Sequence, residues 1–182
     1  MQRVTGVDLA AKSSNPTGIA VLDVRERKFL AIGHVYTDDE ILDVVASTDS
    51  SIVVIDAPLS FPPRGLAFRK VELEAIRRGA RLLPLTMPAM RVLVERAVRL
   101  AARLRRLRVS IYETHPWSAL RLSGCSFHEL LERLRIASIE GGLSKHERDA
   151  VIAALVGLCV LEGCAERFEA GGDVLFLLKK IC

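Results

Sequence analysis

The sequence predicts an α/β domain in which three antiparallel strands and two parallel strands form one mixed sheet flanked by helices. Three observations lead to this fold class. The first 36 residues contain three short apolar runs separated by polar turns, two β-branched runs follow at 51–58 and 109–112, and helical patterns separate those two runs. Strands that alternate with helices in this way are typical of parallel pairing.

The N-terminal half supplies the expected sheet. Residues 3–10, 18–24 and 28–36 are expected to form an antiparallel meander, and a short helix over 38–46 leads to the run "SIVVIDAP" at 51–58. A short β-branched run bounded by turn residues is typical of a strand buried on both faces, here ending at Asp56. Helices are expected over 68–78, capped by Gly79, and over about 89–107, before a fifth strand that ends at Glu113.

The C-terminal half is expected to be mainly helical. Helices are predicted at roughly 116–122, 126–138 and 145–167, and residues 174–178 could add an edge strand. Because there is no internal repeat, low-complexity tract or linker, residues 1–182 are expected to form a single domain. The order of elements resembles the ribonuclease-H-like arrangement, in which the fourth strand lies beside the first and brings Asp8 close to Asp56.

Composition bounds the class of protein. The chain has 182 residues, of which 50% are hydrophobic, and a net charge of +4, which permits contact with nucleic acid without requiring it. The longest apolar stretch, 150–161, is too short to span a bilayer, and the chain opens without a basic-then-apolar leader, so a cytoplasmic protein with no membrane partner is expected. Gln2 and Asn15 are the only side-chain amides, which favours a thermophilic source.

Four cysteines stand at positions 125, 159, 164 and 182. They form no CxxC pair and lie beside no paired-histidine motif, and Cys159 falls in an apolar helical pattern. Buried thiols are therefore expected rather than a zinc site.

Acidic residues occupy the ends of the predicted elements. Asp8 lies within an apolar strand, Asp56 ends the fourth strand and Glu113 ends the fifth. Ligand sites gather beyond the carboxyl ends of parallel strands. Taken alone, Asp56 could be a turn-forming residue, and Glu113 could be the partner of a nearby arginine rather than a metal ligand.

The segment "SKHERDAVIAALVGLCV" at 144–160 predicts a helix with a functional first turn. Ser144 and Glu147 form a capping box, which gives Glu147 a structural role. His146 and Asp149 share one face, and Asp149 begins the apolar stripe that must face the core. A helix dipole favours a carboxylate here but contributes too little to offset burial, so a bound cation is the preferred explanation.

Together, these acids predict a divalent-metal site. Asp8, Asp56 and Asp149, with Glu113 as a ligand or support, would repel one another and raise each other's pKa values. Hard carboxylate oxygens suit Mg²⁺ or Mn²⁺ better than zinc.

Several basic residues are candidates for substrate contact. Arg64 and Arg69 follow Asp56 and could hold a phosphate, with Lys12 a weaker candidate. A stripe of arginines at positions 96, 99, 103 and 106 could follow phosphates or form surface ion pairs. Aromatic residues make up only 5% of the chain, which argues against stacking platforms for single strands.

The motifs resemble a known family. "GVDLA", "TGIAVLD", "VVIDAPLS", "YETHP" and "SKHERDA", in this order, are similar over nearly the whole chain to the predicted ribonuclease-H-like nucleases grouped as domain of unknown function 429. His146 followed by Asp149 also resembles the last metal-binding helix of Holliday-junction resolvases. That resemblance implies metal-site roles for Asp8, Asp56, His146 and Asp149, although the resolvases usually carry Glu where Asp56 stands.

The leading expectation is a nuclease that hydrolyses phosphodiester bonds with two Mg²⁺ or Mn²⁺ ions. A non-catalytic domain that binds nucleic acid or protein is one alternative. Another is an ATP-using phosphotransferase of the actin and sugar-kinase type, but Asp8-Leu9-Ala10 and Asp56-Ala57-Pro58 lack the glycines of its phosphate loops. The sequence leaves open whether RNA, DNA, a hybrid or a junction is cut, and the oligomeric state.

Overall fold

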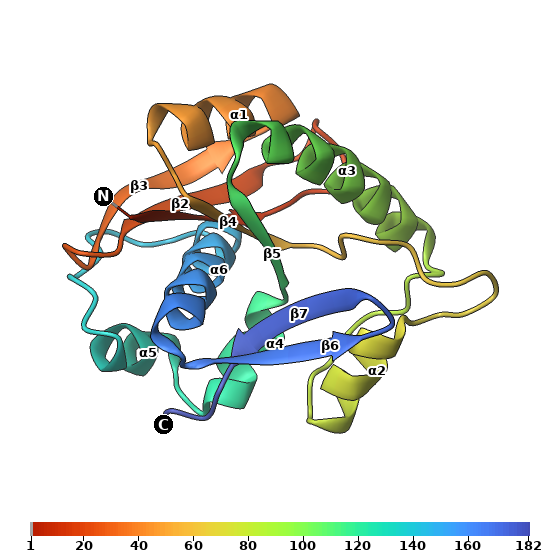
Figure 1. Cartoon of the computed structure of the whole chain (residues 1–182). Coiled ribbons are helices and arrows are strands. Elements are labelled where there is room, and N and C mark those ends of the chain that lie inside the picture. The colour runs from red at the N-terminus through yellow and green to blue at the C-terminus, as the bar shows by residue number, and fades with distance from the viewer. Residues whose placement is uncertain (1) are drawn as a thin grey trace.

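Five strands form the central sheet in the computed structural model, which describes residues 2–182. Their order is β3 (Lys28–Val35), β2 (Thr17–Asp23), β1 (Arg3–Asp8), β4 (Ile52–Asp56) and β5 (Ser110–Thr114). β1 pairs antiparallel with β2, and β2 with β3, whereas β4 is parallel to β1 and β5 is parallel to β4 (Figure 1). The predicted fold class is confirmed.

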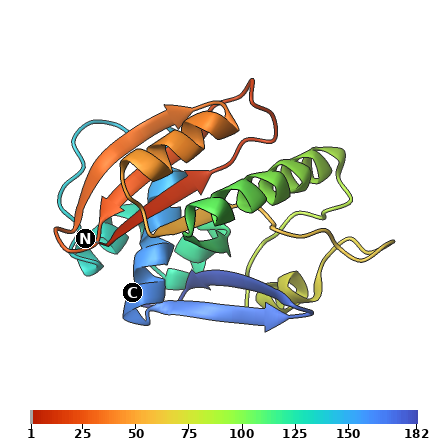
Figure 2. The ribbon, with the colours of Figure 1, turned by 45° about the horizontal axis from the view of Figure 1, so that its top comes forward.

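Two helices cover one face of the sheet. α1 (Asp38–Ser47) and α3 (Pro88–Leu104) lie above it in Figure 1, and the tilted view of Figure 2 shows both on the same side. Val7, Val53 and Ile55 of the sheet pack there with Ile41 of α1 and Leu100 of α3. A short 3₁₀ turn, Arg105–Leu107, leads from α3 into β5.

α6 (Lys145–Glu162) packs against the opposite face. Every residue from Asp149 to Cys159 is buried, because α2 (Lys70–Arg77), α4 (Pro116–Ser123), α5 (Phe127–Arg133) and the C-terminal hairpin share this side of the sheet. α6 is thus a core helix with no solvent face along most of its length.

The C-terminal region differs from the prediction. α6 ends at Glu162 rather than near 167, because Gly163 adopts a left-handed conformation (φ 78°) that caps the helix. The chain then forms β6 (Ala165–Ala170) and β7 (Asp173–Leu178), which pair only with each other as a separate two-stranded sheet. Residues 174–178 are a strand, as expected, but not an edge of the main sheet.

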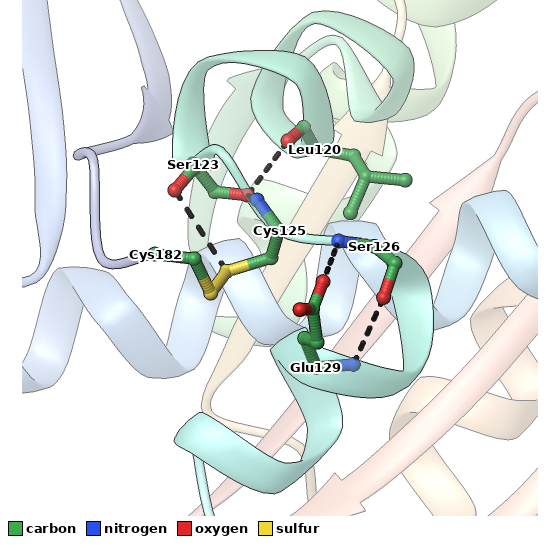
Figure 3. Close-up of a disulfide and its surroundings, with 6 residues drawn as sticks. All are labelled: Leu120, Ser123, Cys125, Ser126, Glu129 and Cys182. Carbon is green, nitrogen blue, oxygen red and sulfur yellow. Dashed lines mark hydrogen bonds between the residues drawn. A yellow bond between two sulfur atoms is a disulfide. The ribbon is translucent and has the colours of Figure 1, made fainter.

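The cysteine prediction was wrong. Cys125 is bonded to Cys182, and Cys159 to Cys164, so no described cysteine is a free thiol. Figure 3 shows the first disulfide between the α4–α5 loop and the end of the chain, beside the N-terminus of α5. The left-handed turn after α6 brings Cys164 back to Cys159, and the Cys164 amide donates to the Cys159 carbonyl at 3.0 Å. Neither pairing can be deduced from the spacing of the cysteines.

The helices of the described residues are all too short or too polar to cross a membrane.

Candidate metal and active site

The first two acids of the site follow directly from the strand register. Val7 lies opposite Ile55, and Asp8 and Asp56 each come one residue later, as the last residues of β1 and β4. Side chains alternate between the faces of a sheet, and Val7 and Ile55 face α1 and α3. Asp8 and Asp56 therefore belong to the α6 face.

Close packing of α6 brings the third acid to the same end of the sheet. A Cβ at Gly6 of β1 would lie 2.1 Å from the Ala150 carbonyl oxygen, and a Cβ at Gly18 of β2 would lie 2.0 Å from the His146 carbonyl oxygen. Glycine at both positions lets the helix backbone rest directly on the strands. This contact sets His146 and Asp149 beside the ends of β1 and β4.

Two side chains in the first turn of α6 form hydrogen bonds with two of the acids. His146 Nδ1 lies 2.7 Å from Asp8 Oδ2, and Lys145 donates from Nζ to Asp149 Oδ2 at 2.8 Å. The acids are mostly enclosed, with side chains 14% and 11% exposed, whereas Lys145 and His146 are exposed to 74% and 44%. Ser144 and Glu147 form the predicted capping box, which confirms the structural role of Glu147.

The acids are coupled electrostatically. Burial raises the pKa of Asp56 well above its usual value, and the negative charges of Asp8 and Asp149 raise it further. Burial also raises the pKa of Asp8, opposed by the His146 hydrogen bond and reinforced by Asp149. Lys145 lowers the pKa of both acids, and its own pKa is raised by Asp149. The site therefore holds more negative charge than its own cations balance.

The donor set fits a hard divalent cation by its chemistry. Within residues 2–182, no three His, Cys, Asp or Glu side chains already gather in a metal-binding arrangement. The carboxylate oxygens that a cation would need are instead held by Lys145 and His146. The Lys145 side chain is largely exposed, so it can move aside without opening the core. Asp8 and Asp56, whose pKa values are raised, gain from a positive ion beside them.

Glu113 and Arg69 form a buried ion pair with each other. Arg69 Nη1 donates to Glu113 Oε2 at 3.0 Å, Nη2 donates to Oε1, and the Leu59 amide donates to Oε2 at 2.9 Å. Arg69 also pairs with Glu72 at 3.0 Å, and its side chain is 1% exposed. The expectation that Arg69 holds a substrate phosphate is corrected, because this guanidinium is enclosed by carboxylates.

The register explains why Glu113 takes this partner. Glu113 lies opposite Ile55, whereas Thr114 lies opposite Asp56. Glu113 therefore alternates to the other face from Asp56 and Asp8, and both of its oxygens are occupied. Of the two readings that the sequence allowed, pairing with an arginine is the one found in the structure, and a direct metal contact by Glu113 stays a prediction.

The other predicted basic residues lie outside the acid cluster. Arg64 is exposed on the segment between β4 and α2, which projects from the body in Figures 1 and 2. Lys12 is exposed in the β1–β2 loop and lines a shallow surface pocket with Arg96 and Arg99. The arginine stripe on α3 is divided between roles: Arg96 is buried and donates to Asp38, and Arg103 pairs with Asp39.

A pocket of about 190 Å³ opens beside the acids. Apolar side chains that include Leu82, Leu85 and Met90 line much of it. Its polar lining comes from Asp8, Asp56, Glu72, Glu113, Thr114 and His115. His115 caps α4 through Nδ1, which accepts from the Ser118 amide at 3.2 Å, so its proton resides on Nε2. Burial lowers the pKa of His115 to about 4, and the ring is neutral at pH 7.

Two features of this site were missed in the sequence. Lys145 lies four residues before Asp149, which is the spacing of a helical ion pair, and this signal was available. The glycines at positions 6 and 18 were available too, since a glycine within a strand marks a close backbone approach.

Comparison with known proteins identifies the fold. No protein-family model and no curated protein sequence matches the chain, so the resemblance to domain of unknown function 429 stays an expectation. The solved structure of Thermus thermophilus RuvC in complex with a Holliday junction substrate matches with a TM-score of 0.56 and 17% identity, over 90% of this chain and 97% of that one. A second structure of Thermus thermophilus RuvC matches with a TM-score of 0.54 and 17% identity, over 88% and 96%. The chain therefore has the ribonuclease-H-like fold found in RuvC.

Proposed function

We propose that this protein is a metal-dependent nuclease that hydrolyses phosphodiester bonds of nucleic acid. The observation that carries the proposal is the placement of Asp8, Asp56 and Asp149, from three separate elements, at one end of the sheet, where burial and acidic neighbours raise the pKa values of Asp8 and Asp56. Such an arrangement costs folding free energy without a cation, and acid clusters of this kind mark functional sites. The fold likeness to RuvC, which is bound to a Holliday junction in one structure, supports nucleic acid as the substrate.

Asp8, Asp56 and Asp149 would hold Mg²⁺ or Mn²⁺. Bound as a pair, these cations would supply activation of the attacking water and stabilisation of the leaving oxygen. In the overall reaction the water oxygen bonds to phosphorus, one phosphorus–oxygen ester bond breaks, and the leaving oxygen receives a proton.

The chain's own residues would handle protons and phosphate charge. His146 uses Nδ1 for Asp8, which leaves Nε2 with no hydrogen-bond partner among residues 2–182 and able to accept or donate a proton. Lys145 presents an exposed ammonium group beside the acids, and we assign to it a contact with the substrate phosphate. Arg64 and Lys12 stay candidates for flanking phosphates, whereas Glu113 and Arg69 would fix the backbone after β4 through Leu59.

The test is cleavage of a panel of labelled substrates: single-stranded, duplex, hybrid and four-way-junction nucleic acids, each with Mg²⁺, Mn²⁺ or EDTA. Asp8→Asn and Asp149→Asn should abolish cleavage. Asp43→Asn is the matched control, because it makes the same change at an exposed carboxylate on α1.

Metal binding is measured in parallel by titration calorimetry. Activity that survives both site substitutions would come from a contaminating nuclease. Metal binding without cleavage of any substrate would refute the proposal and leave the non-catalytic binding domain. Mg²⁺-dependent hydrolysis of ATP instead would favour the phosphotransferase.

A further inference from the structure

An exposed cluster of one tryptophan and two arginines lies on segments that also contribute residues to the acid-lined pocket. Trp117, the only tryptophan of the chain, stands in the first turn of α4 and is 49% exposed. The guanidinium carbons of Arg81 and Arg121 each lie 5.8 Å from the centre of its ring. Arg121 comes from the same helix, whereas Arg81 comes from the segment between α2 and α3.

Both sides of the cluster are joined to the pocket. Arg81 directly precedes Leu82 and Leu83, and Trp117 follows His115 by two residues; these three neighbours all line the pocket. Ser118 fixes the two segments to each other, because its hydroxyl accepts from the Arg81 amide at 3.0 Å and lies 2.8 Å from His115 Nδ1. These contacts hold the Arg81 backbone beside the first turn of α4, which carries Trp117.

The two guanidinium groups are available to an anion. Across the described residues, neither Arg81 nor Arg121 has a carboxylate partner, in contrast to Arg69, Arg96 and Arg103. A distance of 5.8 Å is near the outer limit of a cation–π contact, so the arginines do not seal the face of the indole ring. An exposed contact of this kind is weak and is readily exchanged for a closer stacking partner.

A flat aromatic ring with two free guanidinium groups matches the chemistry of a single-stranded nucleic acid. A base has two flat faces that stack on an indole, and the adjoining phosphates attract guanidinium groups whatever the sequence. A protein partner would offer carboxylates to the arginines, but it would not present a flat ring to the indole at every residue, as a nucleic acid does at every nucleotide. The low aromatic content argues against an extended platform, but a single ring is sufficient for one nucleotide.

We infer that Arg81, Trp117 and Arg121 bind an unpaired nucleotide of the substrate strand next to the cleavage site, with its base stacked on Trp117 and its phosphates held by the two arginines. This inference rests on the proposed function for the class of ligand. It adds that the substrate must expose at least one unpaired nucleotide, so that a fully paired duplex is bound less tightly than a single strand or a flap.

The single tryptophan makes the test direct. Intrinsic fluorescence is followed while Asp8→Asn protein in EDTA is titrated with a single-stranded oligonucleotide, an abasic oligonucleotide of equal length, and a blunt duplex. Binding is measured independently by anisotropy of a label on the nucleic acid. We expect saturable quenching by the single strand only, and weaker binding of the abasic strand.

Substitutions separate stacking from charge. Trp117→Ala should weaken single-strand binding roughly 5- to 100-fold, and Trp117→Phe should restore most of it. Arg81→Gln and Arg121→Gln should each make the negative slope of log K against log salt concentration shallower by about 0.7. Arg108→Gln is the control, because that exposed arginine precedes β5 at the opposite end of the strand.

Each outcome decides the inference. Tight binding with unchanged fluorescence, or equal binding by Trp117→Ala, overturns it even if the wild-type enzyme cleaves nucleic acid. Quenching with the expected variant series supports it even if no cleavage is found, and the nuclease proposal then fails alone. Absence of binding to every nucleic acid overturns both.

Discussion

The two disulfides should differ about twofold in their contribution to stability. A cross-link reduces the conformational entropy of the unfolded chain by an amount that grows with the length of the loop it closes. Cys125 and Cys182 are 57 residues apart, whereas Cys159 and Cys164 are 5 apart. The loop-entropy relation gives about 4 kcal/mol for the long loop and about 2 kcal/mol for the short one at 25 °C.

The measurement uses each protein as its own reference. The Cys159→Ala/Cys164→Ala variant keeps only the long loop, and the Cys125→Ala/Cys182→Ala variant keeps only the short one. Each variant is unfolded in urea with its remaining disulfide intact and again after reduction. Cavities left by the alanines are present in both states and cancel, which matters because Cys159 is 0% exposed.

The expected result is a fall in the urea midpoint on reduction that is about twice as large for the long loop. At a typical urea dependence of about 2 kcal/mol per molar, the two shifts are about 2 M and about 1 M. Equal shifts, or a larger shift for the short loop, would refute the reasoning that chain entropy governs these cross-links. Failure of either variant to form a disulfide in air would refute the pairing itself.

Three further predictions concern the site. The folded-state pKa of Asp56 is raised above its usual value of 3.8, so the metal-free protein should gain stability relative to Asp56→Asn as the pH falls through that raised pKa toward 3.8, and should lose it as the pH rises. Urea unfolding in EDTA measures this difference, and parallel pH profiles of the two proteins would contradict it. Arg69→Met should lower the free energy of unfolding by about 3–5 kcal/mol, because it leaves the Glu113 carboxylate buried without its partner. A loss below about 1 kcal/mol in urea unfolding would show that the ion pair is dispensable. Gly18→Ala should lower the free energy of unfolding by about 1–3 kcal/mol and weaken Mn²⁺ binding, because the added methyl group would displace the His146 backbone. Unchanged Mn²⁺ affinity in calorimetry would show that this packing does not affect the metal site.

The parts of the fold that could be predicted are those that local pattern determines. The β-branched run at 52–55 is typical of a buried strand, and the short polar turns between the first three strands favour an antiparallel meander, so the topology could be predicted from the order of elements. Asp8, Asp56 and Asp149 could be placed at one end of the sheet for the same reason. Asp8 and Asp56 end their strands, and Asp149 lies near the N-terminus of α6, so the direction of each element fixes where its acid lies.

The errors arose where distant segments meet. Arg69 was expected to face a substrate because it follows Asp56 in sequence. It instead forms an ion pair with Glu113 of β5, which lies 44 residues later in the chain. Side-chain alternation could have separated Glu113 from Asp56, because Ile55 and Glu113 are register partners and share a face. The cysteine pairs depend on where α6 and β7 end, which the sequence did not reveal.

The disulfides also connect two expectations about the source of the protein. Disulfides are rare in the cytosol of most cells and persist mainly in oxidising compartments, with the intracellular proteins of hyperthermophiles as the exception. The expected cytoplasmic location is therefore consistent with Cys125–Cys182 and Cys159–Cys164 only if the expected thermophilic source is also correct. The cytoplasmic expectation therefore depends on the thermophilic one, whereas a thermophilic source is compatible with either location.

Glycine connects the fold to the chemistry of the site. Gly6 and Gly18 let α6 approach β1 and β2, and Gly157 does the same farther along the helix, where a Cβ would lie 2.5 Å from Val4 Cγ1. A helix held at three points against a sheet cannot move its first turn away to relieve repulsion between Asp149 and Asp8. The carboxylates must then be neutralised by protons, by Lys145 and His146, or by a divalent cation. Close packing of α6 thus keeps the carboxylates near one another, and the proposed metal ions would neutralise their negative charge.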